Sequence, residues 1–146
     1  MKISDEGLAL IMRFEGFSPT PYFCPAGYLT IGYGHLVASP SLFPEPISQE
    51  VAKALLEKDV RRAEFAVMKY ITVPLAQHRF DALVSFTFNL GAGALQRSSL
   101  RRKVNRKEHG DVPKELMRWV WAGGKKQKGL IRRRCAEADL YRSGLN

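Results

Sequence analysis

One glutamate stands directly before a stretch of glycines, aromatic residues and strand formers, and this part of the chain is the best suited to acid–base chemistry. Glu15 is followed by Gly16, and residues 22–35 read YFCPAGYLTIGYGH. A carboxylic acid can stay protonated near neutral pH where partly apolar surroundings raise its pKa, and it can then protonate a leaving oxygen. Phe14 and Phe17 would help to provide such surroundings. The pattern therefore predicts a general acid at Glu15, facing a glycine-rich hairpin.

A helix and a small sheet are predicted to position this glutamate. Ser4 can cap a helix that runs to about Phe14, and the helix then ends at the Glu15–Gly16 pair. Its apolar residues recur at spacings of three and four and form one stripe: Leu8, Ile11 and Met12. Prolines within 18–25 break helix, and residues 28–31 are strand formers between glycines. We expect a small antiparallel sheet here.

The rest of the chain carries mostly helical patterns. Five further helices are predicted, over 48–70, 76–90, 99–109, 111–122 and 129–142. The first is amphipathic and long enough to bridge two lobes, and the second is strongly apolar and ends at Gly91. Gly110 stops the third helix. The expected fold class is α+β, mostly helical, with one small antiparallel sheet near the N-terminus.

Length and composition indicate one folded domain. The chain has 146 residues, of which 45% are apolar and 25% charged, and this composition argues against disorder. Its two cysteines, Cys24 and Cys135, stand in no CxxC or Cys/His cluster, so we expect neither a metal site nor a disulfide framework. Residues 1–16 contain several charges, and we expect no signal peptide and no membrane anchor.

The net charge of +9 favours a polyanionic partner. Much of the basic excess lies in 101–107 and 125–134. The second segment can attach to anionic lipopolysaccharide or teichoic acid, with the last helix disturbing membranes, or it can be ordinary solvated charge. We expect no nucleic-acid partner, because no helix-turn-helix signature, zinc spacing or RNP-like motif is present.

The pattern E-G followed by Y-x-C-x-x-G-x-x-T-I-G-x-G-H resembles, without gaps, the active-site segment of phage-type lysozymes, glycoside hydrolase family 24. Weaker motifs carry the resemblance onward through 88–93, 98–101, 118–119 and 129–134. The resemblance implies a single lysozyme-like catalytic domain over 1–146, with two lobes that flank a cleft and are joined by a long helix. The small lobe would cover about 15–60, and the helical lobe about 70–146 plus the N-terminal helix.

The same resemblance assigns a catalytic set. Glu15 would protonate the leaving oxygen, while a water held by Cys24 and Thr30 attacks from the opposite face and inverts the anomeric configuration. Inverting enzymes keep their two catalytic groups roughly 6.5 to 9.5 Å apart, which leaves room for that water.

The other residues that the resemblance assigns bind sugar or support the site. Leu36 and Phe88 would line the saccharide cleft, and Asn89 would offer polar contacts. His35 would pair with Asp59 on the long helix. Arg133 would approach Glu15.

Cys24 has two interpretations. Many family members carry Asp at this position, and a thiol is a poorer base unless nearby positive charge or a helix N-terminus ionises it. On general grounds Cys24 can equally be a small buried hydrophobe. Cys135 is expected to be inert.

The function implied is that of an endolysin muramidase, a lysozyme-type glycoside hydrolase. It would hydrolyse the β-1,4 bond between N-acetylmuramic acid and N-acetylglucosamine in peptidoglycan, as a monomer and without a cofactor. The expected location is the host cytoplasm until a separate membrane-lesion protein, a holin, gives access to the cell wall and periplasm. Two alternatives stay open: a lytic transglycosylase that leaves 1,6-anhydro ends, and a basic non-catalytic protein that binds envelope or nucleic acid.

Overall fold

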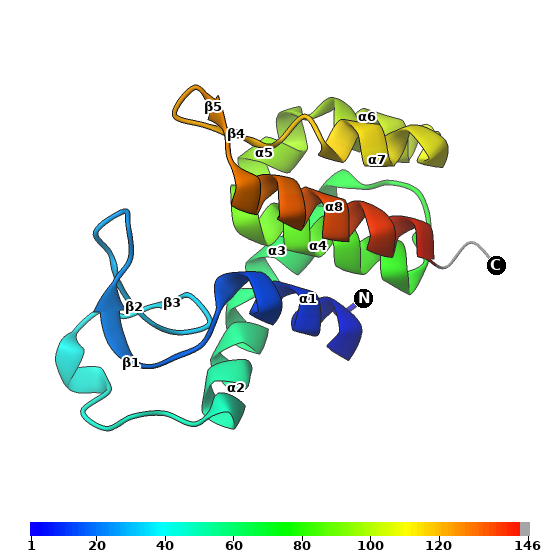
Figure 1. Cartoon of the computed structure of the whole chain (residues 1–146). Coiled ribbons are helices and arrows are strands. Elements are labelled where there is room, and N and C mark those ends of the chain that lie inside the picture. The colour runs from blue at the N-terminus through cyan, green and yellow to red at the C-terminus, as the bar shows by residue number, and fades with distance from the viewer. Residues whose placement is uncertain (144–146) are drawn as a thin grey trace. The chain divides into compact units, whose positions relative to one another are not determined.

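The computed structural model describes residues 1–143, and the chain divides into two compact units. The sheet unit comprises residues 11–61, and the helical unit comprises residues 1–10 together with the chain from Arg62 onward. Figure 1 shows the strands β1–β3 in the first and most of the helices in the second. Helix α1 (Asp5–Glu15) begins in the helical unit and ends in the sheet unit.

The sheet unit contains three antiparallel strands in the order β1-β2-β3 and one long helix. Its elements after α1 are β1 (Ser18–Phe23), β2 (Leu29–Gly32), β3 (His35–Leu36), the 3-10 turn η1 (Pro40–Leu42) and α2 (Gln49–Asp59). Helix α2 packs against β2 and β3. Ile31 of β2 and Ala52 and Leu56 of α2 are almost completely buried and form the centre of this unit.

The predicted signals at both ends of α1 are confirmed. The Ser4 hydroxyl accepts a hydrogen bond from the Gly7 N–H at 3.2 Å, which satisfies one of the free donors of the first turn. At the other end the Gly16 N–H donates to the Met12 carbonyl at 3.0 Å. The helix ends at Glu15, one residue beyond the predicted end, so this residue lies where the chain turns into β1.

The small antiparallel sheet is also confirmed, and it includes a strand that the prolines concealed. Strand β1 contains Pro19 and Pro21, which cannot donate to a strand ladder. It lies at the edge of the sheet, where proline is tolerated, and its register with β2 is irregular between Ser18 and Tyr22.

The single helix predicted over 48–70 is wrong. The chain forms α2 up to Asp59 and then α3 (Arg61–Tyr70), with a break at Val60. The Val60 N–H still bonds to the Leu56 carbonyl, but its ψ of −14° moves the following peptide off the α-helical path. The amphipathic pattern continues across this break, which explains why periodicity did not reveal it.

The helical unit is built around the packing of α4 (Gln77–Leu90) against α8 (Lys128–Ser143), which lie side by side in Figure 1. Phe80, Leu83 and Phe86 of α4 and Tyr141 of α8 are almost completely buried. The α4 helix confirms the predicted apolar helix with Gly91 as its cap, because the Gly91 N–H donates to the Thr87 carbonyl at 2.7 Å.

Between α4 and α8 the chain forms shorter helices than predicted. It forms α5 (Ala92–Arg97), α6 (Ser99–Asn105), the 3-10 turn η2 (His109–Asp111) and α7 (Val112–Leu116). Helix α5 was not predicted. The helix expected over 99–109 ends at Asn105, two residues before Lys107 takes a positive φ of 60°, which no α-helix continues.

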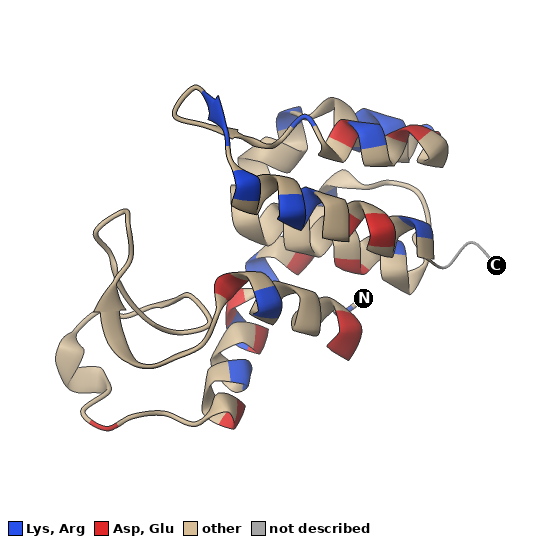
Figure 2. Cartoon of the chain, viewed as in Figure 1, with Lys and Arg blue, Asp and Glu red and all other residues tan. Residues whose placement is uncertain are grey.

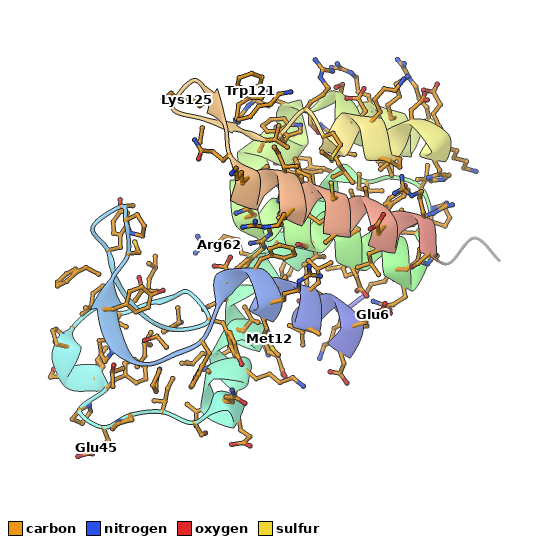
Figure 3. All side chains as sticks on the ribbon, in the orientation of Figure 1. Glu6, Met12, Glu45, Arg62, Trp121 and Lys125 are labelled. Atoms are coloured by element: carbon orange, nitrogen blue, oxygen red, sulfur yellow. The ribbon has the colours of Figure 1, made fainter. Side chains whose placement is uncertain are left out.

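The helix predicted over 111–122 is likewise wrong, because its second half is a hairpin. Strands β4 (Trp121–Ala122) and β5 (Lys125–Lys126) pair antiparallel. The two residues between them, Gly123 and Gly124, have φ values of +60° and +75°, the backbone of a two-residue hairpin turn. Trp121 and Lys125, labelled in Figure 3, project from this hairpin, and the Trp121 side chain is exposed.

No helix among residues 1–143 is long and apolar enough to cross a membrane.

Candidate active site

The Glu15 carboxylate lies against the backbone of the turn between β2 and β3. A Cβ built on Gly34 would stand only 2.7 Å from Glu15 Oε1. Gly34 also has φ +81°, a conformation that side chains rarely adopt. Glycine at this position therefore allows the hairpin backbone to approach the carboxylate, which gives the G-x-G part of the sequence pattern a physical reason.

An aromatic contact holds the same two segments together. The rings of Phe17, just after α1, and Tyr33, in the β2–β3 turn, are 5.5 Å apart between centroids, and Tyr33 is buried. Phe17 therefore lies where the sequence analysis expects an apolar neighbour of the site. Phe14 has a different contact, because the Arg13 guanidinium lies over its ring at 4.9 Å.

Cys24 stands at the start of the tight turn that joins β1 to β2. The Gly27 N–H donates to the Cys24 carbonyl at 2.8 Å, and the Cys24 N–H donates to the Tyr28 carbonyl at 2.9 Å. Pro25 follows Cys24 and presets φ for such a turn. The thiol is partly exposed and forms no disulfide.

The turn lowers the pKa of the Cys24 thiol below its ordinary value. The largest cause is hydrogen bonding from the Tyr28 backbone, and the Ala26 and Gly27 backbone act in the same direction. Desolvation opposes them but is outweighed. This hydrogen bonding is a different source of ionisation from the positive charge or helix N-terminus that the sequence analysis considered.

Thr30 is a buried residue of β2, opposite Tyr22 of β1 and Leu36 of β3. Its hydroxyl donates to the Tyr28 carbonyl at 2.9 Å. A hydroxyl has one proton and two acceptor lone pairs, so Thr30 Oγ1 keeps acceptor capacity for a further donor.

Leu36 presents apolar surface beside Thr30. Directly opposed residues of an antiparallel sheet place their side chains on the same face, so Tyr22, Thr30 and Leu36 share one face. The Leu36 side chain is 63% exposed there and is available to a ligand.

The structure brings His35 and Asp59 together. His35 Nδ1 lies 2.8 Å from Asp59 Oδ2, and the two side chains are 26% and 28% exposed. The contact ties β3 to the C-terminal end of α2. It therefore fixes the strand that follows the Gly34 turn.

Three predicted site residues lie in the helical unit: Phe88, Asn89 and Arg133. The side-chain amide oxygen of Asn89 accepts a hydrogen bond from Arg134 at 2.8 Å, and Phe88 is partly exposed. Arg133 is buried and donates to the Ser85 carbonyl at 3.3 Å. Their combination with Glu15 in one site stays a prediction.

A buried ionic cluster in the helical unit was missed. Arg134 and Glu137 are both 0% exposed, and Arg134 Nε lies 2.6 Å from Glu137 Oε1. The Ser85 hydroxyl donates to the second Glu137 oxygen at 2.6 Å. The interpretation of 125–134 as solvated charge is therefore wrong for Arg133 and Arg134. Their spacing to Glu137, on the face of α8 that also carries Tyr141, was the available signal.

Within residues 1–143, no group of three or more His, Cys, Asp or Glu side chains is arranged to hold a metal ion.

Comparison with known proteins shows which family the chain belongs to. A family model described as "Phage lysozyme" matches residues 12–137. The chain belongs to the phage lysozyme family. An endolysin of Acyrthosiphon pisum secondary endosymbiont phage 1 is 39% identical, over 98% of this chain and 99% of its own length. An endolysin of Bacillus phage B103 is also 39% identical, but the chain spans only 55% of that protein.

Solved structures agree with the sequence relatives. An endolysin from Escherichia coli O157:H7 phage FAHEc1 matches with a TM-score of 0.89 and 36% identity, over 99% of this chain and 96% of that one. A P22 lysozyme mutant matches with a TM-score of 0.87 and 32% identity, over 97% and 98% of the two chains. The fold is therefore lysozyme-like, as predicted. Family membership identifies a peptidoglycan-cleaving enzyme of the endolysin type.

Proposed function

We propose that this enzyme is a muramidase, which hydrolyses the β-1,4 bond between N-acetylmuramic acid and N-acetylglucosamine by an inverting single displacement. The observation that carries the proposal is the Gly34 turn, which brings the Glu15 carboxylate against the hairpin that holds Cys24 and Thr30. All of these residues belong to the sheet unit. The sheet unit alone would therefore supply both the acid and the side chains that hold the attacking water.

The proposed reaction forms one bond and breaks one bond. Protonated Glu15 gives its proton to the glycosidic oxygen as the bond from that oxygen to the anomeric carbon breaks. The oxygen of a water molecule attacks the anomeric carbon from the opposite face. The water proton passes to the Cys24 thiolate, and Glu15 is left as a carboxylate.

Thr30 and Cys24 have complementary tasks towards that water. Because the Thr30 proton is donated to the Tyr28 carbonyl, the free lone pairs of Thr30 Oγ1 can accept one hydrogen of the water. The thiolate can accept the other. The lowered thiol pKa increases the thiolate fraction at neutral pH, although it also makes the thiolate a weaker base.

The saccharide would lie on the sheet face that carries Leu36. The exposed Leu36 side chain offers the apolar contact that sugar rings use, one strand away from Thr30. We also propose that Phe88 and Asn89 contact the saccharide.

Mass spectrometry of digested peptidoglycan tests the proposal. Fragments with ordinary reducing muramic acid ends are expected, and the Glu15→Gln variant should release almost none. Fragments with 1,6-anhydro ends would instead support a lytic transglycosylase, which needs only one acid–base carboxylate. Undiminished lysis by the Glu15→Gln variant would remove Glu15 from the acid role.

A further inference from the structure

The excess of positive charge in this chain lies in the helical unit. The sheet unit has four Lys and Arg against five Asp and Glu, which leaves 19 basic and nine acidic residues in the helical unit. Figure 2 shows basic residues on α6, on the β4–β5 hairpin and on α8. No Lys or Arg stands between Arg13 and Lys53, a stretch that contains the proposed catalytic hairpin. An anionic partner would therefore be attracted to the helical unit.

Two adjoining surface pockets of the helical unit form an arginine groove along α5 and α6. The first, of about 360 Å³, is lined by Arg97, Arg101, Arg102 and Arg106, with polar side chains between them. The second, of about 320 Å³, shares Arg97 and Arg102 with the first and adds Arg118. No acidic residue lines either pocket.

Two of these arginines are held in place by the protein. Arg101 Nε donates to the Tyr70 carbonyl at 3.0 Å, and a terminal nitrogen of Arg101 donates to the Gln96 carbonyl at 3.0 Å. Arg118 donates to Ser99 at 2.8 Å and lies 3.2 Å from the Glu115 carboxylate. Both side chains are therefore already ordered, and binding a ligand would cost them little further conformational entropy.

The other arginines of the groove are not neutralised. Arg97, Arg102 and Arg106 are exposed and form no ion pair within residues 1–143. The nearest acidic side chains in the chain, Glu108 and Asp111, pair with Lys103 instead. Like charges on one short stretch of helix repel one another, so the groove gains stability when an anion binds.

The shape and chemistry of the groove fit a chain of phosphates. A guanidinium group matches a phosphate in a two-pronged contact, which a lysine ammonium group cannot make. At about 1.5 Å per helical residue, the seven residues of α6 alone extend on the order of 10 Å, which exceeds the size of one phosphate. Successive phosphates of a linear polymer would therefore each meet an arginine.

The aromatic rings that contact the groove arginines do not offer a platform for nucleobases. The Trp119 ring meets the edge of Phe86 at 5.5 Å between centroids, and Arg97 lies over it at 5.9 Å. The Arg101 guanidinium lies over the Tyr70 ring, 4.8 Å from the ring centroid. Proteins that hold single-stranded nucleic acid stack bases on open aromatic rings. A phosphate polymer without bases is the better match.

We propose that the arginine groove binds a linear polyol-phosphate polymer of the bacterial cell wall, of the teichoic-acid type, and so retains the enzyme beside its substrate. The retention rests on the proposed function, whereas the binding itself does not. The partner site is the groove on α5 and α6, distinct from the 125–134 segment considered in the sequence analysis.

A binding experiment with matched variants tests this assignment. The probe is soluble poly(glycerol phosphate), titrated by calorimetry into the full chain at low and at physiological salt. The variant Arg102→Gln/Arg106→Gln removes two exposed charges of the groove and leaves the structural Arg101 untouched. The control Lys125→Gln/Lys128→Gln removes two exposed charges outside it. Thermal melts should show that both variants fold like the parent.

The groove variant should bind at least about tenfold more weakly, as expected for lost hydrogen bonds to charged groups. The control should lose only the smaller effect of net charge. Equal loss in both variants, or no binding by the parent protein, would overturn the proposal. A single-stranded DNA with the same number of phosphates is the second probe. Tighter binding of that DNA through the groove would also overturn it.

Activity on purified glycan strands that carry no polyol phosphate separates this proposal from the proposed function. Both variants should cleave such strands as fast as the parent, because Arg102 and Arg106 have no part in the proposed catalytic site. A groove variant that binds normally to the polymer but cleaves slowly would contradict the assignment. A parent protein that cleaves no strands would end the proposed function, while the binding result would stand.

Discussion

Replacing Gly34 with alanine should disable the enzyme more than it destabilises it. The new Cβ would stand 2.7 Å from Glu15 Oε1, whereas ordinary van der Waals contact begins at 3.4 Å. The carboxylate is the flexible end of a side chain, so it would give way by about 0.7 Å rather than unfold the hairpin. Productive catalytic geometry tolerates displacements of about 0.5 Å, and a misplacement of about 1 Å can cost on the order of a hundredfold in rate.

The backbone makes a separate contribution that a second glycine can measure. A non-glycine residue at φ +81° costs roughly 1–2 kcal/mol. Gly124 has a similar φ of +75°, but nothing lies within 4 Å of a Cβ built there. Gly124→Ala should therefore lose similar stability and retain activity.

The assay compares both variants in thermal unfolding and in the initial rate of peptidoglycan solubilisation. The two should lose similar stability, and Gly34→Ala alone should lose activity, by about a hundredfold. If Gly34→Ala keeps the activity of Gly124→Ala, the contact between Glu15 and the hairpin backbone does not position the acid.

Three further predictions concern the partner of the acid and the supporting contacts. In a Cys135→Ser background, the rate of Cys24 alkylation should rise with pH and reach its midpoint at a lower pH than for a free cysteine in solution, because the thiol pKa is lowered. Cys24→Ala should lose most activity, and Cys24→Asp should retain it. His35→Asn should lower the free energy of unfolding at pH 6 by about 1–2 kcal/mol, since it breaks the bond between β3 and α2, as denaturant titration would measure. Glu137→Ala should cost about 3–5 kcal/mol, because it leaves Arg134 buried without its partner.

Each of these predictions can fail on its own. Full activity of Cys24→Ala would reduce that cysteine to packing, and an alkylation midpoint equal to that of free cysteine would mean that the turn does not lower the thiol pKa. Unchanged stability of His35→Asn would mean that the pair with α2 contributes nothing to the fold. A loss below about 1 kcal/mol for Glu137→Ala would show that solvent reaches Arg134 in the variant.

The sequence predicted best where a local signal decides the structure. Ser4 and Gly16 fix the two ends of α1 through hydrogen bonds to neighbours in the chain, and Gly91 does the same for α4. The strand that carries Thr30 follows from strand formers between glycines. Each of these signals lies within or next to the element that it predicts.

The sequence predicted the structure less well where tertiary contacts or small backbone changes determine it. The break at Val60 leaves the amphipathic pattern intact, and the short β4–β5 hairpin lies in a segment whose apolar residues also suit a helix. The burial of Arg134 depends on Glu137, Ser85 and Asn89, which come together only in the folded helical unit. A run of arginines gives no sign of this by itself.

The proposed mechanism depends most on a water that attacks opposite Glu15 from the side of Cys24 and Thr30. Proton magnetic resonance of the newly formed reducing ends, recorded early in digestion before the anomers equilibrate, tests this directly. We expect the α-anomer to form first, because a single displacement inverts the β-linkage. Initial formation of the β-anomer would contradict it.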